Sequence, residues 1–403
     1  MHKLWYEVPP TAGLPLRWRD LMPGDANLSA AIAQYLALPE TQIECSGTAA
    51  LVVALTALRQ ESARYKVILP AYTCPLVALA VAHCGLQPIL CDLRADSFDL
   101  DHEQLSRLCD DTTLAVIPTH LGGRIADLAP VLAIAHRVGA RVIEDAAQAL
   151  GAYAQGQAVG SIGDIGFWSL AVGKGLTLYE GGVLFARDAA LRQRLRQVSA
   201  QLVQHDALWE LRRSLELLGY GALYHPLGLY LAYGRPLRRA LRRDDPVAAV
   251  GDDFDAAIPL HRVGRWRQAV GVHALARLPA FQQSLRVLAA QRKPVLAQVP
   301  GIQVLDDAPG TQGAWPFFML LLPTARARDA ALEELWTAGL GVSRLFIHAL
   351  PDYAYLAHLF HASAVPNARD FASRMLTLSN SPWLNEAQFA RVVSVLGDAA
   401  NRG

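Results

Sequence analysis

The feature that most constrains the fold is an alternation of short apolar runs with helix-like segments between Gly47 and Ala186. The apolar runs are rich in Val, Ile and Leu and read "KVILPAY", "QPILCDL", "LAVIPTH", "RVIEDAA", "IGFWSL" and "GGVLFA". The helix-like segments are Thr48–Arg59, Pro75–His83, Asp101–Leu108 and Ile125–Val138. Short continuous apolar runs separated by helices are typical of strands that are covered on both faces. The pattern predicts an α/β fold with a mostly parallel central sheet sandwiched by helices.

Length and charge narrow the class of protein further. A chain of 403 residues is long enough for two domains of ordinary size, and a hydrophobic fraction of 52% supplies an ample core. The formal net charge of +1 argues against nucleic acid as a general partner, because nucleic-acid-binding chains are usually strongly basic.

The N-terminus and the cysteines indicate a reduced, cytoplasmic protein. The opening stretch "MHKLWYEVPPTAGLPLRWRD" has prolines and charges where a secretory signal would have an apolar core. The five cysteines are odd in number and show no C-x-x-C spacing, so the sequence suggests neither a metal site nor a disulfide framework.

Polar residues follow several of the expected strands. In "ECSGTAALVVALTAL", Ser46–Thr48 opens a long apolar helix, and a helix N-terminus is a ready anion site. Asp145 ends "RVIE", Ser169 ends "GFWS", and Lys174 comes five residues later. Taken singly, these are ordinary helix caps and a snorkelling lysine. Because ligands collect at the carboxyl ends of parallel strands, we expect all four features to meet there.

Lys174 stands in the apolar stretch "GFWSLAVGKGLTLYEGG", between two glycines. Burying an ammonium costs several kcal/mol unless it is paired or loses its proton. Pyridoxal phosphate resolves the conflict, because it requires a Schiff-base lysine, an anion site, a carboxylate at the ring nitrogen and a group covering the ring. We interpret Lys174 as that lysine, Asp145 as the carboxylate, and Ser46–Ala49 with Ser169 as the phosphate site. Gln148, one helical turn beyond Asp145, is a candidate for contact with the ring hydroxyl.

Six stretches resemble one known family in order and spacing: "SGTAALVVAL", "VILPAYT", "AVIPTHLGG", "VIEDAAQALGA", "VGSIGDIGFWSL" and "EGGVLF". They are similar to the DegT-type aminotransferases, fold-type-I pyridoxal-phosphate enzymes that mostly aminate keto-sugar nucleotides. The likeness is dense between residues 47 and 186 and weaker near residues 266–278 and the C-terminus. It implies a large cofactor-binding domain over residues 1–260 and a small C-terminal α+β domain over residues 261–403. It also implies a homodimer with sites near the interface.

By this resemblance, Lys174 matches the Schiff-base lysine, Asp145 the ring-nitrogen partner and Gln148 the residue at the ring oxygen. Ser169 and the turn of Gly47, Thr48 and Ala49 match the phosphate ligands. Some relatives carry His in place of the lysine and act as sugar dehydratases, and Lys174 argues against that variant.

Two departures from the family pattern concern the cofactor. An aromatic ring usually stacks on the cofactor two residues after the position of Tyr72, where this chain has Cys74. Either the thiol packs on the ring or Tyr72 takes over. The family also tends to have an Asn that reaches the phosphate of the neighbouring subunit. The matching stretch here, "PLHRVGR", has no Asn, and His261 or Arg262 is the candidate replacement.

The resemblance to the family fades over residues 203–260. The apolar, aromatic stretch 215–234 is followed by the strongly basic "RPLRRALRR" of residues 235–243. We favour a helical insertion packed on the subunit or its dimer mate over a transmembrane helix, because Glu216, a proline and several glycines interrupt the run. Contact of residues 215–243 with a lipid-like substrate at a membrane, or arginines that hold a substrate diphosphate, are the alternatives.

The substrate residues are the least defined. His120 ends the strand "LAVIPTH" and is a candidate for substrate contact or for a structural role. Arg344 and His348 lie where relatives bring C-terminal residues towards the substrate.

The predicted reaction moves an amino group from an amino acid, glutamate in most of the family, through pyridoxamine phosphate to a keto-sugar nucleotide. A non-sugar carbonyl acceptor and a non-catalytic, regulatory cofactor-binding protein are the alternatives. A nicotinamide dehydrogenase lacks support, because no G-x-G-x-x-G follows the first strand.

Overall fold

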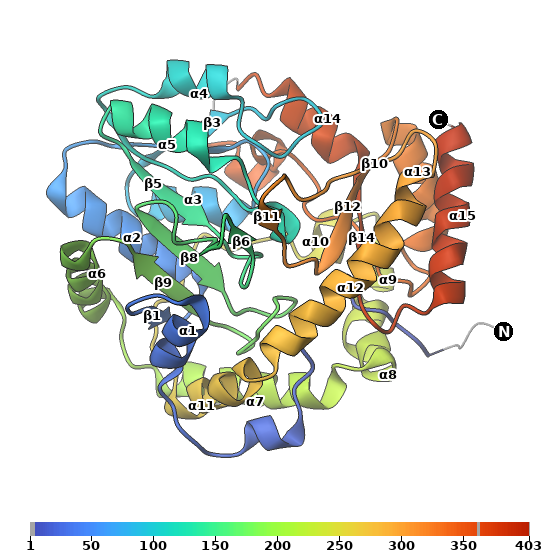
Figure 1. Cartoon of the computed structure of the whole chain (residues 1–403), viewed down its shortest axis with the longest axis horizontal. Coiled ribbons are helices and arrows are strands. Elements are labelled where there is room, and N and C mark those ends of the chain that lie inside the picture. Colours follow the sequence, from blue (N-terminus) through green and yellow to red (C-terminus); the bar gives the residue numbers. More distant parts are fainter. Residues whose placement is uncertain (1–4, 361–362, 403) are drawn as a thin grey trace.

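A seven-stranded sheet forms the centre of the computed structural model, which describes residues 5–360 and 363–402 (Figure 1). The strand order is β1 (Gln42–Glu44), β9 (Gly182–Ala186), β8 (Ile165–Ser169), β5 (Arg141–Asp145), β4 (Thr113–Val116), β2 (Lys66–Pro70) and β3 (Gln87–Cys91). Neighbours from β8 to β3 pair in parallel, and β9 is antiparallel to both β1 and β8. The predicted α/β fold with a mostly parallel sheet is confirmed.

Helices cover both faces of this sheet because successive strand residues point to opposite sides. Ile68, Val116 and Val142 pack in one apolar cluster with residues of α4 (His102–Leu108) and α5 (Leu128–Arg137). Their neighbours along the strands, such as Val67 and Leu69, pack in another cluster with the helices of the other face. Those helices are α2 (Gly47–Glu61), α3 (Pro75–His83) and α6 (Ala189–Leu202).

A second, antiparallel sheet lies beside the first in the C-terminal part of the chain (Figure 1). Its strands in order are β10 (Gln303–Val304), β12 (Phe317–Leu321), β14 (Met375–Ser379) and β13 (Val342–Ser343). The accompanying helices are α12 (Leu278–Ala297), α13 (Ala325–Leu335), α14 (Pro366–Arg374) and α15 (Glu386–Arg402). A small third sheet joins β11 (Thr311–Gln312) to the hairpin of β6 (Tyr153–Ala154) and β7 (Gln157–Ala158).

Two segments connect the parts of the molecule across the expected boundary near residue 260. Helix α11 (Arg265–Leu275) packs against α1 (Leu28–Leu36) and the 3-10 turn Trp18–Leu21. Val8 forms a bridge with Leu340 and lies in the apolar core of the C-terminal part. The division into residues 1–260 and 261–403 therefore stays a prediction.

Residues 203–260 are largely helical, as expected. They comprise α7 (Ala207–Leu223), α8 (Pro226–Leu229), a π-helical turn at Tyr230–Gly234, α9 (Arg235–Leu241) and α10 (Pro246–Val250). The fully buried Arg267 of α11 anchors α7 by donating to Glu210 over 2.9 Å. Five leucines of α7 are exposed: Leu208, Leu211, Leu215, Leu218 and Leu223.

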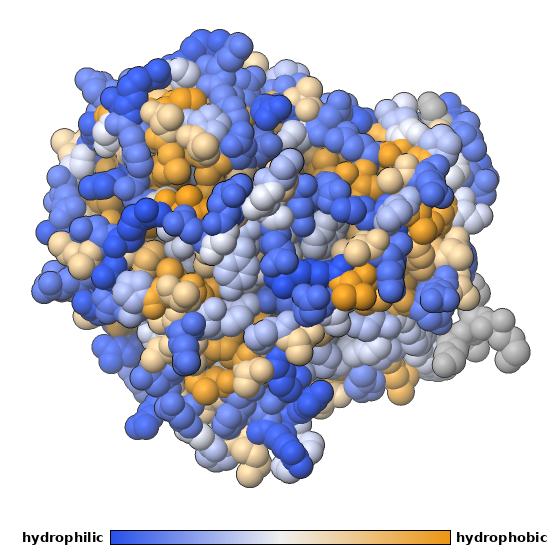
Figure 2. All heavy atoms as spheres, in the orientation of Figure 1, coloured by the Kyte–Doolittle hydropathy of each residue, from blue (hydrophilic) through white to orange (hydrophobic). Residues whose placement is uncertain are grey.

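The surface mixes hydrophobic and hydrophilic residues. Figure 2 shows hydrophobic residues in small patches among hydrophilic ones on the face that it presents. Within residues 5–360 and 363–402, no helix combines the length and the hydropathy needed to cross a membrane.

Candidate active site

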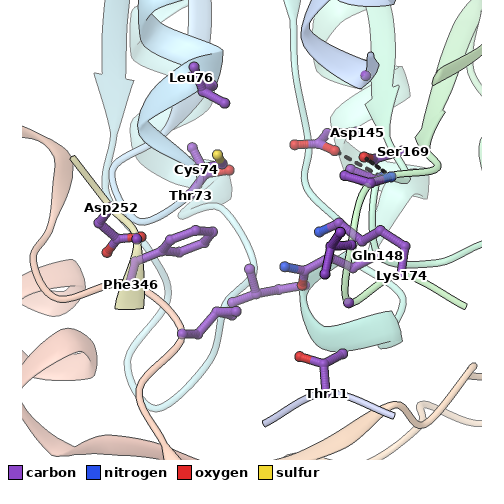
Figure 3. A pocket seen from close by; sticks show the side chains of 18 of the residues that line it. Thr11, Thr73, Cys74, Leu76, Asp145, Gln148, Ser169, Lys174, Asp252 and Phe346 are labelled. Atoms are coloured by element: carbon purple, nitrogen blue, oxygen red, sulfur yellow. Dashed lines mark hydrogen bonds between the residues drawn. The ribbon is translucent and has the colours of Figure 1, made fainter. Parts of the chain in front are cut away.

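A cavity of about 500 Å³ lies at the carboxyl ends of the parallel strands (Figure 3). Cys74 follows β2, Thr119 follows β4, Asp145 ends β5 and Ser169 ends β8, and all four line the cavity. The first residues of α2, which follow β1, line it too. The C-terminal part closes it with residues 316–317, 343–346 and 377. The parallel sheet thus places the polar residues at one edge, as the sequence predicts.

Lys174 reaches this cavity from the loop that follows β8. Gly173 before it has a φ of +80°, a left-handed conformation that glycine adopts without strain. Burial lowers the pKa of the Lys174 ammonium, and the thiol of Cys74 and the carboxylate of Asp145 oppose that shift. A lysine that sheds its proton readily is a nucleophile for a carbonyl carbon.

Asp145 is buried on the same side of the cavity, with a side chain only 3% exposed. Its Oδ1 accepts a hydrogen bond of 3.0 Å from the amide of Ala147. Burial raises the pKa of the carboxyl, and the Ala147 amide and the charge of Lys174 oppose the rise. A cation brought against Asp145 would lower the pKa of the carboxyl again, so the position suits a protonated ring nitrogen.

The N-terminus of α2 offers an anion site. Ser46 caps the helix, and its hydroxyl accepts from the amide of Ala49 over 2.9 Å. The amides of Gly47 and Thr48 have no acceptor within the described residues, as is usual in a first helical turn. A Cβ on Gly47 would stand 3.3 Å from the Cβ of Ser169, so glycine keeps this corner open. Of the three amides predicted to bind phosphate, that of Ala49 is already occupied by Ser46.

Gln148 also lines the cavity, where Figure 3 shows it beside Lys174. Its Oε1 accepts from the amide of Gly122 over 2.6 Å. This bond fixes the side chain and leaves the NH₂ group of Gln148 as a donor to a ring oxygen.

The two candidates for covering the cofactor ring, Cys74 and Tyr72, differ in whether they line the cavity. Cys74 lines the cavity, and burial raises the pKa of its thiol to about 12, so the group stays neutral. Tyr72 is 1% exposed and packs edge-on against Phe346 and Phe371, with its hydroxyl donating to the carbonyl of Phe346 over 3.0 Å. The ring of Tyr72 therefore belongs to the core and does not line the cavity.

The three substrate candidates differ in position. His120 and Arg344 line the cavity, whereas His348 does not. The Nε2 of His120 lies 3.0 Å from Oε2 of the buried Glu144, and its Nδ1 accepts from the amide of Ala126. Both ring nitrogens of His120 are thus engaged. Arg344 donates to two main-chain carbonyls, those of Ile347 and Ala372, at 2.6 and 2.9 Å.

The basic residues proposed for phosphates do not line the cavity of their own subunit, and contact of His261 or Arg262 with a neighbouring subunit's phosphate stays a prediction. His261 is buried 3.1 Å from Glu180, which does line the cavity, and Arg262 is exposed. Arg238 donates to Glu7 over 2.7 Å and to the carbonyl of Thr337. The remaining arginines of the basic stretch are exposed: Arg235, Arg239, Arg242 and Arg243. A diphosphate site made by this stretch is not supported.

Several lining residues escaped the sequence analysis. Thr73 and Thr119, whose hydroxyls lie 3.0 Å apart, stand directly before Cys74 and His120 in stretches that resemble the family. Their place after strands was a usable signal. Tyr233 and Asp252 come from the segment without family resemblance and carried no such signal.

The family is decided by a match over most of the chain. The model of the DegT/DnrJ/EryC1/StrS aminotransferase family matches residues 17–222 and 262–397. The chain belongs to this family. The match omits residues 223–261, which include α8, α9 and α10.

Named relatives of this aminotransferase act on sugar nucleotides. It is 36% identical to the GDP-perosamine synthase of Caulobacter vibrioides over 372 residues, 91% of this chain and 87% of the relative. It is 30% identical to a UDP-N-acetyl-3-dehydro-alpha-D-glucosamine 3-aminotransferase of Acidithiobacillus ferrooxidans over 358 residues, 87% of this chain and 82% of the relative.

The fold of this aminotransferase matches solved structures in cofactor-bound forms. The PLP form of the putative sugar aminotransferase Spr1654 from Streptococcus pneumoniae superposes with a TM-score of 0.74 at 18% identity. The comparison covers 98% of this chain and 99% of that one. Fold type I is thereby established.

Pyridoxal phosphate is the family's cofactor, and the residues present fit it. The cavity holds a lysine with a lowered pKa, a buried carboxylate and two helix-terminal amides without acceptors. Lys174, Asp145 and the turn at Ser46–Thr48 all line this cavity, which is what a cofactor held by all three requires. Lys174 would hold the aldehyde carbon, Asp145 the ring nitrogen, and the turn with Ser169 the phosphate.

Proposed function

We propose that this enzyme moves an amino group from an amino-acid donor, glutamate, to the carbonyl carbon of a keto-sugar nucleotide. The names of the relatives support the acceptor class, since they carry UDP- and GDP-linked sugars. The single observation that carries the proposal is the meeting of Lys174, Asp145 and the N-terminus of α2 in one cavity.

The bound cofactor supplies an electron sink for the carbanion that forms when the donor loses its α-proton. Asp145 promotes this by keeping the ring nitrogen protonated, since a carboxylate beside a pyridinium favours the charged form of both. The turn at Ser46–Thr48 and the hydroxyl of Ser169 orient the phosphate by hydrogen bonds and by the helix dipole. Cys74 presents a neutral thiol to the same space.

Lys174 has two tasks in the proposal. Its amine would hold the aldehyde carbon of the cofactor, and once an amino-acid amine takes that place, the freed Nζ would accept the α-proton and pass it on. Burial helps, because it lowers the pKa of the Nζ towards neutral pH. The glycines at 173 and 175 remove side-chain bulk beside the moving lysine.

A half-reaction experiment tests the function. Glutamate added to the purified, yellow holoenzyme should shift its visible band and release one 2-oxoglutarate per site. UDP-N-acetyl-3-dehydro-D-glucosamine added next should restore the band. Lys174→Ala should fail in both steps, and Lys293→Ala, whose ammonium pairs with Asp306 away from the cavity, should behave as wild type. A holoenzyme that releases no 2-oxoglutarate would point to the non-catalytic alternative, and release without sugar turnover to another carbonyl acceptor.

Assembly and location complete the proposal. We propose a cytoplasmic homodimer, on the family resemblance and on the five cysteines, all of which are free thiols. Light scattering of the holoenzyme at micromolar concentration should give twice the chain mass of 43.7 kDa.

A further inference from the structure

Part of the cavity wall comes from the segment that the family model omits. Residues 223–261 fall outside the match, yet Tyr233, Val250, Gly251, Asp252 and Phe254 line the cavity. Figure 3 shows Asp252 and Phe346 across the cavity from Lys174 and Gln148. This wall therefore faces a molecule bound at Lys174, and its residues lie outside the part of the chain that the family model matches.

Asp252 is the one carboxylate of that wall. Its side chain is 3% exposed, and its Oδ2 accepts hydrogen bonds from the Tyr353 hydroxyl at 2.6 Å and the Ile347 amide at 2.8 Å. The Tyr355 hydroxyl donates to the main-chain carbonyl of Asp252 over 2.6 Å. Two bonds thus hold the carboxylate in a fixed position, and the third holds the main chain of Asp252.

The second oxygen of Asp252 is free for a ligand. Within residues 5–360 and 363–402, Oδ1 accepts no hydrogen bond, and it is not one of the fully buried polar atoms that lack a partner. It is therefore accessible from the cavity. A carboxylate oxygen can only accept, so its natural partner is a hydroxyl or an N–H group. It would repel a phosphate or another carboxylate.

The residues around Oδ1 further restrict the chemical class of ligand that this wall can bind. Val250, Phe254 and Phe346 make the neighbouring wall apolar. Arg344, which also lines the cavity, donates from its Nη2 to the carbonyls of Ile347 and Ala372, while its buried Nε has no partner within the described residues. An apolar wall with one fixed acceptor fits the face of a sugar ring and one of its hydroxyls better than it fits a charged group.

We propose that Asp252 is a specificity residue that accepts a hydrogen bond from a ring hydroxyl of the acceptor sugar. Residues 223–261 thereby select acceptors that keep a free hydroxyl near the carbonyl. The inference rests on the proposed function and deepens it. The donor half-reaction does not use this contact, because glutamate offers no hydroxyl and its one amine is the group that reacts at the cofactor.

Two acceptor probes separate the contact from general damage. UDP-N-acetyl-3-dehydro-D-glucosamine has a free ring hydroxyl at C4, beside its carbonyl, and another on C6, whereas a dTDP-linked 4-dehydro-2,3,6-trideoxyglucose has no sugar hydroxyl. Wild type should prefer the hydroxylated probe. Asp252→Asn keeps an oxygen for Tyr353 and Ile347 but turns Oδ1 into a donor. The variant should lose about 10- to 100-fold in kcat/KM for the hydroxylated probe, and less than about twofold for the trideoxy probe and for the glutamate half-reaction.

Asp253→Asn is the matched control, since Asp253 is the exposed neighbour and does not line the cavity. It should leave all three rates unchanged. Equal losses for both probes, or no loss for either, would overturn the assignment of Asp252. A wild-type enzyme that reacts with glutamate but with neither probe would overturn the sugar acceptor, and Asp252 with it. Failure with glutamate itself would overturn the proposed function at its first step.

Discussion

Gly182→Ala gives the sharpest test of the phosphate site because the geometry fixes what one methyl group would do. Gly182 is buried in β9, paired with Glu44 of β1 on one side and Ser169 of β8 on the other. A Cβ there would stand 2.2 Å from the carbonyl oxygen of Ser46 and 2.7 Å from the amide nitrogen of Gly47. Ordinary contact begins near 3.4 Å, so the turn at the start of α2 must move by about 1.2 Å.

Such a shift has two measurable effects. Overpacking should lower the free energy of unfolding of the apoprotein by about 1–3 kcal/mol. The displaced amides of Gly47 and Thr48 should lose one charge-assisted bond to the phosphate, which weakens cofactor binding about 10- to 100-fold. Urea unfolding measures the first effect, and a cofactor titration followed by visible absorbance measures the second.

Gly219→Ala is the control for this prediction. Its Cβ would meet nothing within 4 Å, and it lies inside α7, where alanine is favoured by up to about 1 kcal/mol. It should bind the cofactor as wild type does. A folded Gly182→Ala protein with unchanged cofactor affinity would refute the assignment of this turn to the phosphate.

Three further predictions follow from buried and surface charges. The buried Glu144 carboxylate accepts hydrogen bonds from three main-chain amides and from His120. In Glu144→Gln the side-chain NH₂ group would face some of these donors and could not accept from them, so the free energy of unfolding measured in urea should fall by about 2–4 kcal/mol. An unchanged midpoint would contradict this. Burial raises the pKa of Asp252 from 3.8 to about 6, so the native state binds the proton more tightly than the unfolded chain and the free energy of unfolding falls as pH rises through about 6. Relative to Asp252→Asn, the free energy of unfolding of wild type should therefore fall by about 2–3 kcal/mol between pH 4 and pH 7. A difference between the two proteins that stays constant with pH would contradict this. The protein should not float with anionic vesicles, despite its exposed leucines and arginines; flotation that is abolished by Arg→Ala changes at 239, 242 and 243 would favour the membrane alternative.

The sequence predicted six of the seven strands of the central sheet because each of the six is a short apolar run, whereas β1 (Gln42–Glu44) has only one apolar residue and was not predicted. The expected helix Pro75–His83 agrees with α3 at both ends, and Thr48–Arg59 falls inside α2. The antiparallel direction of β9 could not be predicted, since direction depends on where the preceding loop returns the chain. The packing of Val8 into the C-terminal core could not be predicted either, because it brings together residues that are far apart in sequence.

The site was predictable where chemistry demands a residue type. A lysine, a carboxylate and a helix start are required by the cofactor, and all three meet in the cavity. Tyr72 was a candidate for covering the cofactor ring only because it lies two residues before Cys74. In the structure its side chain points into the core, where the hydroxyl donates to the carbonyl of Phe346. Asp252 was missed because an aspartate in a loop between helices is usually a cap or a solvated charge, and only folding places it opposite Lys174.

The most direct test of the account is to locate the covalent attachment of the cofactor. The chain has four lysines, at positions 3, 66, 174 and 293, so borohydride reduction of the holoenzyme followed by peptide mass spectrometry can distinguish them all. The account predicts a phosphopyridoxyl group on Lys174 and its loss in Lys174→Ala. A reduced adduct on another lysine, or one that survives the substitution, would contradict it.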